Sequence, residues 1–158
     1  YEILIGLVGS EMCIRDRLFD YLNERTGTYV LCFDIVGLMR INDEISREAG
    51  DKVILESLKR INAAAGEDMP VLRIGGDEFV MVTGLDDVEK VTKIAKAVME
   101  KNGVETAYKG GTVPVSIRSG AVMIRKPLKY SMLCHDFDEV ISFARNDGEV
   151  HFAKAEQR

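Results

Sequence analysis

The sequence predicts an α+β domain in which packed helices cover one mainly antiparallel sheet. Two observations support this fold class. Strand-like segments and segments with helical periodicity alternate in the order strand, helices, hairpin, helix, strands, helix, strand. The 158 residues are 46% hydrophobic and 30% charged, which is ordinary for one globular domain with a workable core.

The first strand is the most strongly marked element. Residues 29–36 read YVLCFDIV, an almost unbroken apolar run that is typical of a strand buried on both faces. The end of a helix is expected before this strand, over 18–24, because the apolar residues there lie on one side. A loop and a short helix are expected after it, over 37–47.

A long helix and a hairpin are expected next. Apolar residues recur at helical spacing, so an amphipathic helix should begin at Asp51 and end at Gly66, the usual residue type after a helix. Its inward positions should be Ile54, Leu58, Ile61 and Ala65. Two runs of strand length follow, over 71–74 and 79–82, and the glycines between them predict a tight turn with positive φ angles.

The second half of the chain continues the alternation. Asp86 and Asp87 should open a helix whose lysines form a solvated face and whose inward residues are Val88, Val91, Ala95 and Val98. Residues 109–111 predict a turn between two strands, and 113–124 a long strand with a kink near 119–120. A helix over 127–145 and a short strand over 149–153 complete the expected order.

Charge and composition exclude several classes of function. A net charge of −5 argues against a general binder of nucleic acid or of anionic membranes, since such proteins carry a basic surface. Cys13, Cys32 and Cys134 show no metal or disulfide spacing, which favours reduced thiols in a cytoplasmic compartment. No apolar run approaches the roughly 18 residues of a membrane span.

Residues 1–16 are expected to be a non-native or disordered extension. The string VGSEMCIRDR within and just after them resembles a translated sequencing adapter. The apolar run before it is short and has no preceding positive charge, so it is a poor signal peptide. The domain proper is therefore expected to span residues 17–158, truncated at its N-terminus.

Carboxylates at two places indicate a magnesium-nucleotide site. Asp34 lies inside the apolar first strand, where a lone charge is costly to bury and a divalent cation would supply the counter-charge. Alternatively, Asp34 lies at an exposed strand end and caps the next turn. Asp77 and Glu78 follow the hairpin glycines, where a purely structural turn needs no pair of carboxylates.

Three stretches together resemble the GGDEF domain of diguanylate cyclases. They are residues 33–43 (FDIVGLMRIND), 49–51 (AGD) and 73–79 (RIGGDEF), and the match extends from about Leu18 to Val150. The resemblance implies a ferredoxin-like palm of the nucleotidyl-cyclase type. It also implies a bacterial signalling enzyme that condenses two GTP into cyclic di-GMP and releases pyrophosphate. Turnover would need a homodimer, brought together by an upstream sensor or dimerisation domain that this chain lacks.

The resemblance also implies a metal site. Two Mg²⁺ ions, or Mn²⁺, would lie between Asp34 and Asp77, with the carbonyl group of Ile35 as a third ligand. Glu78 would lie beside the ions and help to position them or the ribose 3′-hydroxyl. Alternatively, Glu78 is only a carboxylate at the edge of a strand.

The same resemblance assigns nucleotide contacts. Asn42 and Asp51 match the residues that read guanine, although Asp51 could also be a helix N-cap and Asn42 a loop residue. Gly75 and Gly76 would let the nucleotide pack against the hairpin backbone. Arg145 stands where the family usually has a phosphate-binding lysine; alternatively, it complements the dipole at a helix end.

Two departures from the family pattern leave rival functions open. Met39 replaces a usual phosphate-binding lysine and Glu149 a usual arginine, which predicts a weak cyclase or a regulatory domain that binds GTP without turnover. Residues 66–69 read GEDM instead of the R-x-x-D product-inhibition motif, so feedback through that site is not expected. An RNA-recognition domain is a third alternative, which the acidic charge disfavours.

Overall fold

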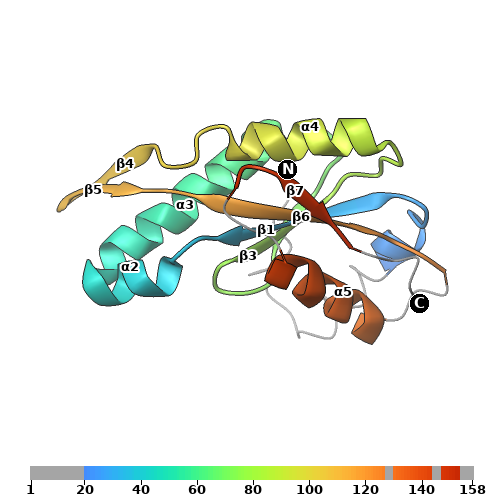
Figure 1. Cartoon of the computed structure of the whole chain (residues 1–158), viewed down its shortest axis with the longest axis horizontal. Helices are drawn as coiled ribbons and strands as arrows, with labels where there is room; N and C mark the ends of the chain where they lie inside the picture. The colour runs from blue at the N-terminus through green and yellow to red at the C-terminus, as the bar shows by residue number, and fades with distance from the viewer. Residues whose placement is uncertain (1–19, 127–129, 144–146, 154–158) are drawn as a thin grey trace.

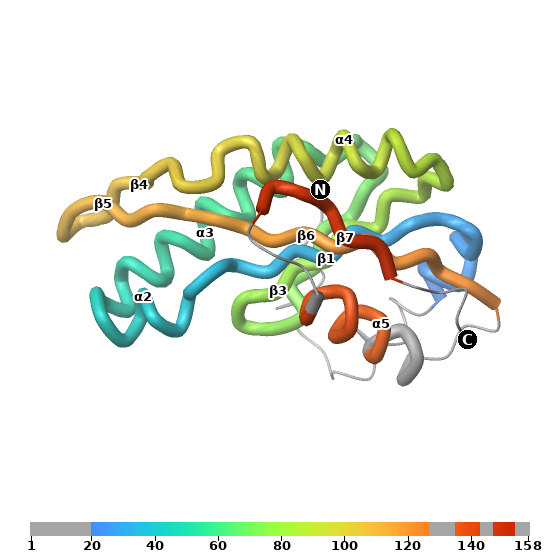
Figure 2. Tube along the Cα trace, in the orientation of Figure 1, coloured from blue at the N-terminus to red at the C-terminus, as the bar shows by residue number. Residues whose placement is uncertain are grey.

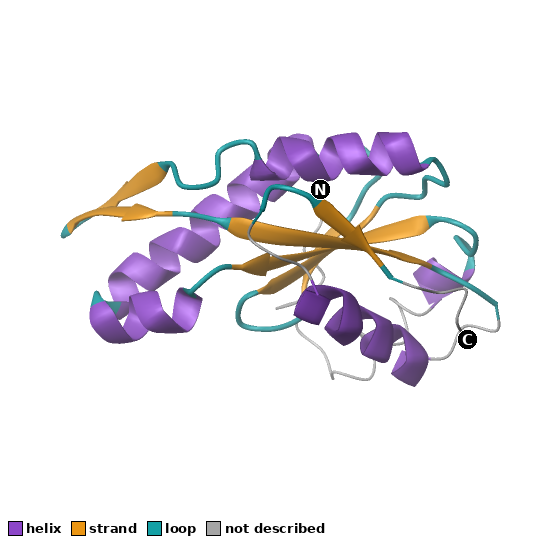
Figure 3. Ribbon diagram, in the orientation of Figure 1, coloured by secondary structure: helices purple, strands orange, loops and turns teal. Residues whose placement is uncertain are grey.

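A five-stranded sheet forms the centre of the molecule in the computed structural model, which describes residues 20–126, 130–143 and 147–153 (Figures 1 and 3). The strand order is β2-β3-β1-β6-β7. The strand bounds are β1 Tyr29–Ile35, β2 Val71–Arg73, β3 Glu78–Val82, β6 Ile117–Met123 and β7 Val150–Phe152. A separate two-stranded sheet, β4 Glu105–Tyr108 with β5 Gly111–Pro114, extends beyond one end of the large sheet (Figure 2).

The connectivity is that of two split β-α-β units. The central strand β1 is antiparallel to both β3 and β6, and β2 is antiparallel to β3. Only the added edge strand β7 runs parallel to its neighbour β6 among the described pairs. The order 2-3-1-6 with crossing helices is the ferredoxin-like arrangement. The expected α+β class, with a mainly antiparallel sheet and packed helices, is therefore confirmed.

The helices divide between the two faces of the sheet. α3 (Arg47–Ala64) and α4 (Val88–Met99) cover one face, and α5 (Tyr130–Phe143) covers the other (Figure 1). The short α2 (Leu38–Glu44) follows β1 and packs against α3. The structure thus has two hydrophobic clusters, one on each side of the sheet.

The strand β1 is apolar along its length because it contributes to both clusters. Leu31, Phe33 and Ile35 face α3 and α4, whereas Val30 and Cys32 face α5. The alternation places the next residue, Asp34, on the α5 side as well. The whole residue is only 3% exposed, so the interpretation of Asp34 as an exposed capping residue is wrong.

The predicted start of the long helix is wrong by four residues. α3 begins at Arg47, and the side-chain oxygen of Ser46 caps it by accepting a hydrogen bond from the Ala49 N–H at 3.0 Å. Asp51 therefore lies inside the helix, and its alternative role as an N-cap is excluded. At the other end, the cap residue Ala65 is extended and Gly66 does not adopt a positive φ angle.

Three further local predictions need correction. The expected long strand is interrupted at Val115 and Ser116, between β5 and β6, and not at residues 119–120. Gly120 is needed for another reason: an added Cβ would lie 2.7 Å from a methyl group of Val140, so a side chain there would displace α5. Val88, expected to face inward, is 48% exposed because it is the first residue of α4.

A buried arginine attaches the β4–β5 hairpin and its connections to α3. The Arg60 guanidinium donates hydrogen bonds to the carbonyl groups of Lys101, Val104 and Val115 at 3.0–3.1 Å, and it pairs with Glu56 at 3.4 Å. Only 6% of its side chain is exposed. Among the described helices, none is both long and apolar enough to cross a lipid bilayer.

Candidate functional site

Three carboxylates converge at one end of the sheet. Asp34 is near the end of β1, Asp77 is in the β2–β3 turn, and Glu78 is the first residue of β3. One oxygen atom from each lies within 4.8 Å of the others. The structure thus brings together the three acidic residues that the sequence assigned to the metal and to catalysis. Such a set of hard oxygen atoms fits Mg²⁺ or Mn²⁺.

Backbone pairing produces this convergence. Asp34 and Glu78 are directly opposed in the antiparallel ladder, so both side chains leave the same face of the sheet. The Ile35 N–H then donates a hydrogen bond to the Asp77 carbonyl group at 2.9 Å, which holds the turn against the end of β1. The backbone of Ile35, whose carbonyl group was the expected third ligand, therefore lies beside the acidic turn.

Arg118 is part of this site, and the sequence reasoning missed it. Arg118 on β6 is the ladder partner of Asp34 on the side opposite Glu78. Its Nε atom donates to Asp34 Oδ2 at 3.0 Å, and a terminal nitrogen also donates to the same oxygen. The burial of Asp34 therefore has an internal counter-ion. Arg118 is the one charged residue in the sequence segment 113–124, and this was the available signal.

Burial and neighbouring negative charges raise the pKa values of Asp34 and Glu78. Burial raises the pKa of Asp34, the hydrogen bond from Arg118 opposes that shift, and the charge of Asp77 adds to it. Burial also raises the pKa of Glu78, and the negative charges of Asp34 and Asp77 raise it further. A cation that binds between these groups would relieve the repulsion among their negative charges.

The turn that carries Asp77 is held by Arg73 and leaves room beside Gly76. The Arg73 guanidinium donates to the carbonyl groups of Gly75 at 3.1 Å and Gly76 at 2.7 Å. Neither glycine has a positive φ angle, so the prediction of a turn that needs left-handed residues is wrong. A Cβ at Gly76 would meet no described atom within 4 Å. Glycine is thus required here neither by the backbone nor by the chain's own packing.

The two candidate guanine readers meet where α2 packs against α3. The side chain of Asn42 lies on Gly50, where an added Cβ would be only 1.7 Å from Asn42 Oδ1. That oxygen is buried and accepts no hydrogen bond from the described residues. Asp51 is the next residue after Gly50, and its side chain is exposed. The structure therefore brings the amide group of Asn42 and the exposed carboxylate of Asp51 to the same helix junction.

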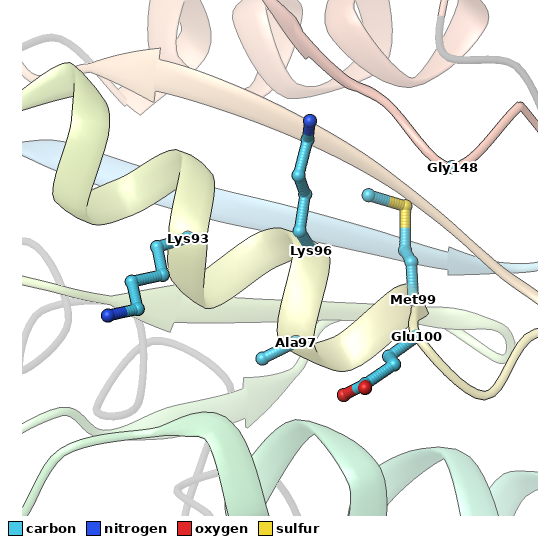
Figure 4. A pocket seen from close by; sticks show the side chains of 6 residues that line it. All are labelled: Lys93, Lys96, Ala97, Met99, Glu100 and Gly148. Carbon is cyan, nitrogen blue, oxygen red and sulfur yellow. The ribbon is translucent and has the colours of Figure 1, made fainter.

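The candidate phosphate positions are spread over distant elements. Met39, at the start of α2, is 78% exposed. Glu149, just before β7, pairs with Lys96 of α4 at 3.3 Å, and both side chains are more than half exposed. Figure 4 shows Lys96 and Lys93 on α4 at a shallow pocket that Gly148 also lines. Arg145 lies outside the described residues, as do residues 1–16.

Comparisons with known proteins show the family. The profile described as "Diguanylate cyclase, GGDEF domain" matches residues 15–151. An uncharacterized protein of Sinorhizobium fredii is 27% identical over 103 residues, which are 63% of this chain and 12% of that protein. An uncharacterized membrane protein of Staphylococcus aureus is 26% identical over 129 residues, which are 79% of this chain and 36% of that protein. The chain thus spans only a minor part of both relatives.

Solved structures show the same fold. The GGDEF domain of TpbB, also called YfiN, from Pseudomonas aeruginosa superposes with a TM-score of 0.77 at 25% identity, over 98% of this chain and 94% of that one. The GGDEF domain of DgcB from Caulobacter crescentus, solved with cyclic di-GMP, gives a TM-score of 0.72 at 18% identity. It covers 89% of this chain and 88% of that one, and at this identity it supports the fold alone.

Proposed function

Since the chain belongs to the family of diguanylate cyclase GGDEF domains, we propose that it condenses two GTP into cyclic di-GMP and releases pyrophosphate. The observation that carries this proposal is the convergence of Asp34, Asp77 and Glu78 within 4.8 Å beside a glycine turn. Paired carboxylates of this kind bind divalent cations, and bound cations in turn accept phosphate oxygens.

In this proposal, Asp34, Asp77 and the Ile35 carbonyl group hold two Mg²⁺ or Mn²⁺ ions. A bound cation supplies Lewis-acid chemistry: it lowers the pKa of the ribose 3′-hydroxyl and spreads the charge of an in-line displacement at phosphorus. Glu78 positions that hydroxyl or the ions from the neighbouring strand. The free space beside Gly76 lets the triphosphate approach the backbone of the turn at Gly75 and Gly76, which Arg73 keeps in place.

Guanine selectivity is assigned to the α2–α3 junction. Asn42 offers an amide group, and Asp51 offers an exposed carboxylate that can accept from guanine N1–H and N2–H₂. Adenine presents a different edge and would leave these groups without partners, which a site built for guanine penalises strongly. Arg145 is proposed as a phosphate ligand, because arginine binds phosphate oxygens through two parallel hydrogen bonds.

The reaction needs two protomers in this proposal, because each holds one GTP. We place the domain in the cytoplasm, where its GTP substrate is found, and its relatives named as membrane proteins are compatible with a membrane-attached parent. Residues 66–69 lack the R-x-x-D pattern, so feedback inhibition by the product through that segment is not expected.

A regulatory domain that binds GTP without turnover is the second candidate. Met39 and Glu149 favour it, because neither can supply the positive charge that the family usually places at these positions. The metal and guanine residues would suffice for binding, while the incomplete phosphate contacts would slow the chemistry.

One experiment separates the two candidates. The domain is incubated with GTP and Mg²⁺ over a range of protein concentrations, and cyclic di-GMP is measured by mass spectrometry. A cyclase gives product at a rate per protomer that rises with protein concentration. Binding of GTP in calorimetry without any product identifies the regulatory domain. Equal affinity for GTP and ATP, or unchanged selectivity in Asp51→Ala, would contradict the guanine assignment.

A further inference from the structure

Arg118, Asp34 and Glu78 form one row across three adjacent strands. Asp34 on β1 is the ladder partner of Glu78 on β3 and of Arg118 on β6. Directly opposed residues in antiparallel strands project from the same face. The carboxylate of Asp34 is therefore placed between the other two acidic groups on one side and a guanidinium on the other.

The contact between Arg118 and Asp34 is direct and sheltered from water. Two nitrogen atoms of the guanidinium donate to the same oxygen, Asp34 Oδ2. The Asp34 side chain is 5% exposed and that of Arg118 is 32% exposed. Little solvent lies between the two charges to weaken their attraction, so a charge-assisted hydrogen bond of this kind is among the stronger ones in a protein.

A cation bound by the three carboxylates would have to share Asp34 with this guanidinium. The cluster carries three negative charges, and Arg118 neutralises one of them. A metal ion at Asp34 would either replace the hydrogen bonds to Oδ2 or lie close to a fixed positive charge on the same carboxylate. Both outcomes lower the affinity for the ion.

We propose that Arg118 is a built-in competitor for the metal at Asp34. This inference rests on the proposed metal site and extends it: the site is preformed and internally neutralised, so it binds divalent cations weakly until the guanidinium is displaced. The triphosphate of a bound nucleotide, with about four negative charges, is a suitable acceptor for the displaced guanidinium. Metal and nucleotide should therefore bind cooperatively.

The test measures metal binding without nucleotide and needs no turnover. Mn²⁺ is titrated into the chain, and free Mn²⁺ is followed by electron paramagnetic resonance. Arg118→Gln should bind Mn²⁺ about tenfold to hundredfold more tightly than the parent, the factor that corresponds to one charge-assisted hydrogen bond. Arg118→Met keeps the apolar stem without the charge, should show the same gain, and serves if the glutamine variant does not fold.

Two control variants make the result specific. Arg125→Gln removes the same charge from an exposed residue past the far end of β6, roughly 20 Å along the extended chain, and should leave Mn²⁺ affinity unchanged. Asp34→Asn should abolish Mn²⁺ binding at this site, both as a single variant and combined with Arg118→Gln. Circular dichroism melts establish that each variant is folded.

The outcomes distinguish this inference from the proposed function. Equal or weaker Mn²⁺ binding in both Arg118 variants, with binding still lost in Asp34→Asn, would overturn the competitor role and make Arg118 a residue that positions Asp34. Absence of any Asp34-dependent Mn²⁺ binding, with and without GTP, would overturn the metal site itself. In the parent, GTP should tighten Mn²⁺ binding more than it does in Arg118→Gln; an equal effect would also contradict the competition.

Discussion

Asp34 is the residue around which the candidate site is arranged. Its position on the α5 face follows from the alternation of β1, and its burial requires a partner for its charge. Arg118 provides that partner from β6, while Asp77 and Glu78 add negative charge from the opposite side. The packing of the sheet thus places one buried carboxylate at the end of the sheet where a cation could bind.

Gly76 is expected to matter for ligand binding and not for folding. Its Cβ would meet no described atom within 4 Å, so Gly76→Ala should change the free energy of unfolding by less than about 0.5 kcal/mol. Because the added methyl group would occupy the space proposed for the triphosphate, GTP affinity should fall by about tenfold or more. Thermal melts and calorimetry with Mg²⁺ and GTP measure the two effects.

The matched variant is Gly120→Ala, which should behave in the opposite way. Its Cβ would lie 2.7 Å from Val140, so α5 must shift and stability should fall by about 1–3 kcal/mol. If Gly76→Ala proved as destabilising as Gly120→Ala, the glycine turn would have a structural role that the packing does not show.

Glu78 should limit stability in the absence of metal. Burial and the charges of Asp34 and Asp77 raise its pKa in the folded protein. A raised folded-state pKa means that stability present below the ordinary carboxyl range, near about pH 4, is lost as the pH rises through the shifted value. In EDTA, Glu78→Gln should therefore melt at a higher temperature than the parent at pH 8, and the difference should disappear toward pH 4.

The control for this comparison is Glu105→Gln, which removes an exposed carboxylate from β4. Its melting temperature should follow that of the parent across the same pH range. A lower melting temperature for Glu78→Gln at pH 8 would show that the ionised carboxylate stabilises the turn through contacts that outweigh the repulsion.

At the scale of elements, the β4–β5 hairpin depends on a side chain from α3. This two-stranded sheet is separate from the five-stranded sheet. Arg60 of α3 donates hydrogen bonds to two carbonyl groups before β4 and to one after β5, so it holds both ends of the hairpin against the helix. The interruption between β5 and β6 lies at Val115, one of those three acceptors. The contact therefore supports both the hairpin and the start of the strand that carries Arg118.

Arg60→Met should lower the free energy of unfolding by about 2–4 kcal/mol, because it removes three hydrogen bonds from a buried charged donor. Arg40→Met is the matched control. Arg40 also pairs with a glutamate four residues away, but the pair is exposed, so its loss should cost about 0.5 kcal/mol or less. Denaturant unfolding of both variants measures the difference. Equal losses would show that Arg60 acts only through its ion pair with Glu56.

At the scale of the whole molecule, the site depends on elements from several parts of the fold. The carboxylates lie at the end of the sheet, the candidate guanine readers at the α2–α3 junction, and the candidate phosphate positions on α2 and beside β7. The chain as a whole carries a net charge of −5, which disfavours the approach of a triphosphate. For the proposed function, local cations and a bound metal ion would have to overcome this repulsion.

Restoring the two cations that the family usually carries should strengthen nucleotide binding. Met39→Lys with Glu149→Arg should tighten GTP binding by about tenfold or more at low salt, since each charge-assisted contact contributes roughly 1.5–3 kcal/mol. The gain should shrink with added salt. Glu149 now pairs with Lys96, so the single variant Glu149→Arg also places two cations together and should gain less than Met39→Lys.

Glu105→Arg with Thr112→Lys controls for net charge, because it adds the same charge to exposed positions of the β4–β5 hairpin. Calorimetry at two salt concentrations compares the two double variants. If both tightened GTP binding equally, the effect would come from the overall field and not from phosphate contacts at residues 39 and 149.

The sequence alone determined the class of the fold and the identity of the acidic residues. The apolar run of β1 and the helical spacing of α4 report burial directly, because each residue's pattern is set by the face that it presents. On α3 the spacing was less exact, since Ile61 is buried but Ile54, Leu58 and Ala65 are only partly buried. The ends of the elements were predicted less accurately. α3 begins four residues before the predicted start because Ser46 caps it, and the expected long strand is divided into β5 and β6 by a break at Val115. Both depend on hydrogen bonds whose partners the pattern does not show.

Only the tertiary structure decided how the site is assembled. The apolar strand around Asp34 and the acidic turn assigned a cation to this residue, but they could not show that Arg118, which is 84 positions away, already faces it across the sheet. Nor could the sequence show that the hairpin glycines need no positive φ angle, or that Glu149 pairs with Lys96. Strand register and helix docking determine these contacts, because they bring together side chains whose separation along the chain carries no information about their distance in space.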